Sequence, residues 1–109
     1  MLKAVCDVQI ENEDYKIIVN VGSMVNVERI SGKKFIEIVK DAESGSILAL
    51  ALLLSACLTK DNEPVGMKFV ESMDFDVFQD LSSPLVETVI KAFPKKNDKK
   101  KVKILTPVK

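Results

Sequence analysis

The sequence predicts an α+β fold, in which an N-terminal β-hairpin is followed by a bundle of four or five short helices. Two observations lead to this fold class. Apolar residues recur at every second position over residues 4–10 and 15–19, and at helical spacing from residue 23 onward. The 109 residues are 47% apolar and 29% charged, which is typical of one globular domain. We expect this domain to span residues 1–94.

The hairpin is predicted from two short alternating runs. The first run places Cys6, Val8 and Ile10 on one face of a strand. A polar cluster at 11–14 follows, and residues 15–19 resume the alternation. Two such strands around a four-residue polar turn indicate a hairpin. The cluster has no glycine, so the turn type stays open.

Two helices are expected next. Ser23 can cap a helix over 23–31, and Gly32 stands at the position that usually follows a helix end. Residues 34–43 then carry apolar side chains at helical spacing with charged residues between them. Ser46 can cap the helix that follows.

The segment 47–58, ILALALLLSACL, contains one polar side chain, Ser55. It is too short to cross a bilayer, which needs about 20 apolar residues. A helix that is apolar on all sides must be covered on all sides. Two interpretations remain open: a central core helix, or a helix with one side available to another subunit or a client protein.

The second half of the domain is predicted as helices. Residues 59–63 form a polar linker, and 65–73 carry a weak helical pattern. The apolar spacing over 74–81 is mixed. Ser-Ser-Pro at 82–84 is typical of a helix start, and 85–93 continue it with a regular apolar stripe.

The composition excludes several kinds of site. The chain has no histidine, which removes His-based triads and His zinc ligands. Cys6 and Cys57 are far apart and lie in apolar contexts, so we interpret both as small core residues of a reduced protein. The acidic residues Glu71, Asp74 and Asp76 are interpreted as helix-end residues rather than metal ligands. We expect no catalytic residues, no metal, no cofactor, no signal peptide and no membrane segment.

Charge is balanced overall but not along the chain. Residues 95–109 hold seven lysines and Asp98, a net charge of +6, so residues 1–94 carry −6. We expect this basic segment to be a flexible, solvated tail. Its lysines suggest contact with nucleic acid as an alternative, but no arginine or aromatic residue is interleaved. Val102, Ile104 and Leu105 could instead form a short strand.

A more specific pattern spans most of residues 4–93. After the hairpin comes a helix ending in Ile-Ser-Gly at 30–32, then an aromatic-led helix beginning Phe-Ile-Glu-Ile at 35–38. A glycine-containing break and a Leu/Ala-rich helix ending Ser-Ala-Cys-Leu at 55–58 follow. An acidic segment at 71–80 and a helix at 85–93 complete the order. This order resembles the tail assembly chaperones of long-tailed bacteriophages.

The resemblance implies a non-enzymatic protein of the host bacterial cytoplasm that is absent from the mature virion. Such proteins bind the tape-measure protein, keep it soluble and promote assembly of tail-tube subunits around it. A tape-measure protein is a long amphipathic helix, so its chaperone needs an apolar binding surface. The side chains that we expect to contact it are Leu48, Leu50, Leu52, Leu53, Leu54, Leu85, Val89 and Phe93.

Two other functions stay open. An oligomeric head–tail connector or tail component would use the same apolar helix to form a homo-oligomer. A small nucleic-acid-binding protein would use the lysine tail, although the acidic remainder of the chain argues against nucleic acid as a partner.

Overall fold

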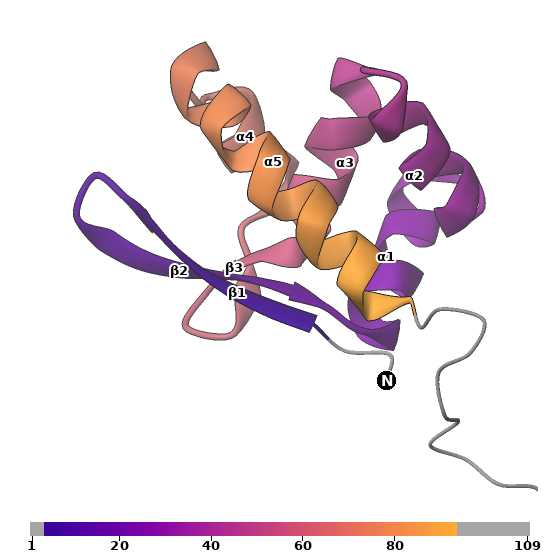
Figure 1. Ribbon diagram of the computed structural model, residues 1–109, viewed down its shortest axis with the longest axis horizontal. Coiled ribbons are helices and arrows are strands. Elements are labelled where there is room, and N and C mark those ends of the chain that lie inside the picture. Colours follow the sequence, from indigo (N-terminus) through magenta and orange to yellow (C-terminus); the bar gives the residue numbers. More distant parts are fainter. Residues whose placement is uncertain (1–3, 94–109) are drawn as a thin grey trace, which may run out of the picture.

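The computed structural model describes residues 4–93 and confirms the predicted α+β fold, with an N-terminal hairpin followed by helices (Figure 1). The sheet is antiparallel with strand order β1-β2-β3-β4. Its strands are β1 (Ala4–Ile10), β2 (Glu13–Val19), β3 (Leu58–Lys60) and β4 (Glu63–Pro64). The helices are α1 (Val21–Ser31), α2 (Phe35–Glu43), α3 (Ile47–Cys57), α4 (Gly66–Glu71) and α5 (Phe75–Ala92). The predicted domain end at residue 94 and the basic tail lie outside the described residues.

The first hairpin closes through a two-residue turn rather than the predicted four-residue turn, because Glu13 and Asp14 pair with β1 as part of β2. Glu11 and Asn12 have φ angles of 52° and 69°, the left-handed pair of a type I′ turn. The register runs without interruption from Ala4 opposite Val19 to Ile10 opposite Glu13. The predicted alternation is confirmed, because the side chains on the helix side of β2 are buried and those of β1 are half-buried.

The predicted linker at 59–63 is wrong, because this segment forms a second hairpin. Asp61 and Asn62 have φ angles of 53° and 68°, which repeats the type I′ turn of the first hairpin. Strand β3 pairs with β2, and the Thr59 hydroxyl donates a hydrogen bond to the Lys16 carbonyl at 2.9 Å. The polar side chains of this segment do not predict a strand. It becomes one because it pairs with β2, which lies far earlier in the sequence.

Helix ends follow side-chain capping. Helix α1 begins two residues earlier than predicted, because Asn20 and not Ser23 is the cap. The Ser23 amide donates to Asn20 Oδ1 at 2.9 Å, and the Asn20 amide donates to Ser23 Oγ at 2.8 Å, which is a reciprocal capping box. Gly32 has φ 71°, as its predicted place after the helix requires. Ser46 caps α3 as predicted, accepting from the Ala49 amide at 3.1 Å.

The predicted helix start at 82–84 is wrong, because α5 begins at Phe75 and runs through this segment as one helix. Pro84 lacks an N–H and therefore leaves the carbonyl of residue 80 without its helical donor. The buried side chains Phe78, Leu81, Leu85 and Val89 nevertheless form one stripe across the proline. Burial of this single stripe holds the two halves of α5 together and outweighs the local helix-start signal.

Helix α3 is the centre of the core. It packs against α1, α2, α4 and α5 and against strands β2, β3 and β4. Figure 1 shows α3, α4 and α5 on the same side of the hairpin, with α5 crossing β1 and β2. Every α3 side chain from Ala51 to Cys57 is buried, so the central-core interpretation holds for this part of the segment.

We predict that Leu54→Ala lowers the free energy of unfolding by about 2–5 kcal/mol, because Leu54 is fully buried and truncation leaves a cavity. The same truncation at Leu48, which is 64% exposed on the same helix, is expected to change it by less than about 0.5 kcal/mol. Urea denaturation of both variants checks this. Equal effects at the two positions would contradict the structure.

Candidate functional site

The eight predicted contact residues fall into different environments. Leu53, Leu54, Leu85 and Val89 are core side chains, so the structure does not place them at a contact surface. Leu85 and Val89 belong to the buried stripe of α5, and Leu53 and Leu54 lie in the part of α3 that neighbouring helices and strands cover. Among the remaining four, Leu50 is half-buried, Leu52 is 7% exposed, Phe93 is 37% exposed and Leu48 is 64% exposed.

Leu48 and Leu52 line a groove where the end of α1, the α2 helix and the start of α3 meet. This apolar groove has a volume of about 310 Å³. Its lining residues are Ile30, Ser31, Lys33, Ile38, Asp41, Ser46, Leu48, Ala49 and Leu52. Phe93 is not among them, since its ring lies against Phe35 with centroids 6.0 Å apart. The structure therefore brings together two of the predicted residues and leaves the others apart.

Local sequence features open this groove. Gly32 ends α1 in a left-handed turn, and the Glu28 carboxylate accepts a hydrogen bond from the Phe35 amide at 2.8 Å. This bond joins α1 to the first residue of α2. The Ser46 cap then starts α3, so that Leu48 stands in its first turn. Ile30 and Leu48 are consequently left 46% and 64% exposed at the groove.

The chemistry of the groove is apolar inside and polar at its edge. Ile38, Ala49 and Leu52 are buried aliphatic side chains, and Lys33 and Asp41 add one charge of each sign. The volume is at the lower end of the range of small-molecule pockets and suits one or two aliphatic side chains. Sequence reasoning missed Ile30 and Ile38, because helical spacing alone did not show which apolar residues stay uncovered.

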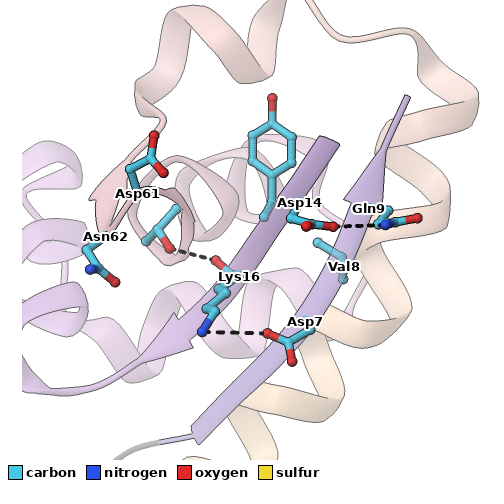
Figure 2. A pocket seen from close by; sticks show the side chains of 9 residues that line it. Asp7, Val8, Gln9, Asp14, Lys16, Asp61 and Asn62 are labelled. Carbon is cyan, nitrogen blue, oxygen red and sulfur yellow. Dashed lines mark hydrogen bonds and ion pairs between the residues drawn. The ribbon is translucent and has the colours of Figure 1, made fainter. Parts of the chain in front are cut away.

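A larger hollow, of about 670 Å³, lies on the sheet, and most of the residues that line it are polar (Figure 2). Its side chains are largely engaged with one another. The side-chain amide of Gln9 donates a hydrogen bond to Asp14 Oδ1 at 2.8 Å, and Lys16 Nζ lies 4.0 Å from Asp7 Oδ1. Figure 2 shows Asp61 on the second hairpin, apart from these two pairs. This arrangement is a set of cross-strand pairs rather than a convergent group around one ligand.

Acidic and sulfur-containing side chains do not gather elsewhere in residues 4–93. No group of three or more Cys, Asp or Glu side chains in that range could hold a metal ion. Cys57 is fully buried, and burial raises the pKa of its thiol to about 12, partly opposed by a hydrogen bond with Ser23. Cys57 therefore stays protonated and unreactive at neutral pH. Cys6 is half-buried on β1.

Comparison with known proteins adds no relative. No protein family, curated protein or solved structure matches this chain. Over the part of the chain that the structure describes, no helix is both long and apolar enough to cross a membrane.

We predict that one thiol, that of Cys6, reacts with a thiol reagent in the native protein at pH 8. The Cys57 thiol is expected to react only in the unfolded protein, because its raised pKa and burial remove the thiolate. Mass spectrometry of labelled peptides checks which thiol reacts, and labelling of Cys57 in the native protein would contradict this prediction.

The raised pKa of Cys57 also predicts that the free energy of unfolding falls above pH 9. The unfolded thiol ionises near its ordinary pKa, whereas the folded thiol resists ionisation up to about pH 12.

Proposed function

We propose that this protein is a non-enzymatic phage tail assembly chaperone whose apolar groove binds side chains of a helical client, the tape-measure protein. The observation that supports the proposal most is the exposure of Leu48 and Ile30 over a buried aliphatic floor. Large apolar side chains that border a concave surface are typical of protein-binding sites. The order of features along the sequence, which resembles the tail assembly chaperones, supports the choice of client.

The walls of the groove favour a helix over an extended strand. The groove is formed by helix ends and helix faces, and no strand is among its lining elements. An extended peptide usually binds by adding to a sheet edge, whereas an amphipathic helix inserts apolar side chains at i, i+3 or i+4 spacing. Two such side chains of the client would bury the exposed parts of Ile30 and Leu48.

The expected affinity is modest. Complete burial of a large aliphatic side chain contributes roughly 1.5–3 kcal/mol, and Leu48 and Ile30 are already partly covered. Binding of one client turn then gains only a few kcal/mol before the entropy of association is subtracted. A weak contact repeated along a long helix keeps the client soluble and still allows tail-tube subunits to displace the chaperone.

The charges at the edge of the groove set the orientation of the client. Lys33 lies beyond the end of α1, and Asp41 lies in the last turn of α2. An amphipathic helix carries charged residues beside its apolar stripe, so one acidic and one basic side chain can pair with these two groups. Exposed ion pairs contribute little energy, and their role here is to select the direction of the bound helix. We place this function in the host bacterial cytoplasm, with the chaperone absent from the mature virion.

We predict that Leu48→Glu abolishes co-purification of the co-expressed tape-measure protein and leaves it insoluble. The carboxylate would put a charge where the apolar stripe of the client is proposed to pack, and binding would have to remove the water around it. Ile47→Glu is the matched control, because Ile47 is 63% exposed in the same helical turn and does not line the groove. Both substitutions place an acid at a helix N-terminus, which is favourable, so both variants should fold.

The measurement is a pull-down combined with the soluble fraction of the client, with circular dichroism as the folding control. Ile47→Glu is expected to behave like the unmodified protein. If the folded Leu48→Glu variant still binds the client, the groove is not its binding site. If the unmodified protein neither binds nor solubilises the tape-measure protein, the chaperone proposal fails.

A further inference from the structure

The two edges of the sheet differ in how well they are protected against pairing. Strand β4 is two residues long and ends in Pro64, which cannot donate a ladder hydrogen bond. Strand β1 is seven residues long and contains neither proline nor glycine, and its register with β2 has no bulge. Within residues 4–93, β2 is the only strand that pairs with β1. Among residues 4–93, no strand therefore covers this long edge of the sheet.

The hydrogen-bonding groups on this edge can be assigned from β2. The Lys16 carbonyl accepts from Thr59 on β3, so it points away from β1. Asp7 is opposite Lys16, and in an antiparallel ladder such a pair directs its backbone groups away from each other. Asp7 therefore presents its N–H and C=O at the outer edge. By alternation, Val5 and Gln9 do the same.

We propose that β1 pairs with β1 of a second copy of this chain, antiparallel, about a two-fold axis at Val8. This register aligns Asp7 with the partner's Gln9 and Gln9 with the partner's Asp7. Each of these two pairs exchanges two backbone hydrogen bonds, which gives four bonds across the axis. The interface is isologous, as two-fold dimers require.

Side-chain chemistry selects this register. On the outer face, Gln9 already donates to Asp14 at 2.8 Å, and its second amide hydrogen is free for the partner's Asp7. On the helix-facing side, Val8 meets the partner's Val8, and Cys6 meets the partner's Ile10. All of these side chains are half-buried in one copy, so pairing covers more of their apolar surface.

The neighbouring registers are less favourable. An axis at Asp7 would place two carboxylates opposite each other, and like charges in that position are destabilising. An axis at Cys6 would place Asp7 against the partner's Val5, which gives the carboxylate no donor. The partner is therefore a second copy, because about Val8 the Gln9 amide donor of one β1 faces the Asp7 carboxylate of the other and apolar side chains face apolar side chains.

The first test measures association of the full chain by sedimentation velocity over a wide concentration range. The unmodified protein is expected to shift from monomer to dimer. Gln9→Pro is expected to remain monomeric, because it removes an outward N–H that β2 does not use. Gln9→Thr keeps the N–H and loses only the side-chain amide, so it should still dimerise, although more weakly than the unmodified protein. Circular dichroism confirms that both variants fold.

The second test examines the register. In a Cys6→Ser background, Val8→Cys is expected to form a disulfide-linked dimer on mild oxidation, since non-hydrogen-bonded pairs across strands have a Cα separation that suits a disulfide. Asp7→Cys in the same background should cross-link far less, because its opposite residue is the partner's Gln9.

Three results would overturn this dimer. The chain could remain monomeric at every concentration, or Gln9→Pro could dimerise as well as Gln9→Thr. Amide exchange at Asp7 and Gln9 could also be slow in the monomer, which would show that another part of the same chain covers the edge. The groove lies on other elements than β1, so the Leu48→Glu variant should dimerise normally. The dimer and the binding of the client are therefore tested independently.

Discussion

The structure depends on covering one helix that has no polar side. Helix α3 carries a single polar side chain, Ser55, whose hydroxyl donates to the Leu52 carbonyl at 2.7 Å within the helix itself. Every direction around α3 must therefore meet apolar side chains. The domain meets this need by arranging four helices and three strands around it. Few elements remain to build a second layer, and for this reason one face of the sheet carries cross-strand polar pairs.

The two ends of α3 differ in how far they are buried. Its last residue leads directly into β3, so the C-terminal end is buried by sheet pairing. Its first turn extends beyond the helices that cover the rest, and Leu48 stays exposed there. The apolar groove is the consequence of this incomplete cover. The same segment thus serves the core along most of its length and offers a surface at one end, and this division supports the proposed role in binding a helical client.

The sheet has a comparable asymmetry. Pro64 closes one edge after two residues, whereas β1 leaves a regular edge on which Gln9 and Asp7 lie at equal distances from Val8, as a donor and an acceptor. The groove and this edge lie on different elements, so client binding and self-association can be separated by mutation. A chaperone that presents two grooves on one dimer would bind a long helical client with higher avidity than a single copy.

The sequence by itself determined the elements whose signals are local. Alternation over 6–10 and 15–19 specified the hairpin, Gly32 and Ser46 marked helix ends, and the run at 47–58 required a buried helix. The tertiary structure decided the conformation of segments that pack or pair with residues far away in the sequence. Residues 58–60 became a strand because β2 offered free backbone groups, and α5 continued through Pro84 because its apolar stripe packs as one surface. The candidate site was predictable only in part, since Leu48 and Leu54 are equivalent in sequence pattern. Only the arrangement of the surrounding helices leaves Leu48 exposed and Leu54 covered.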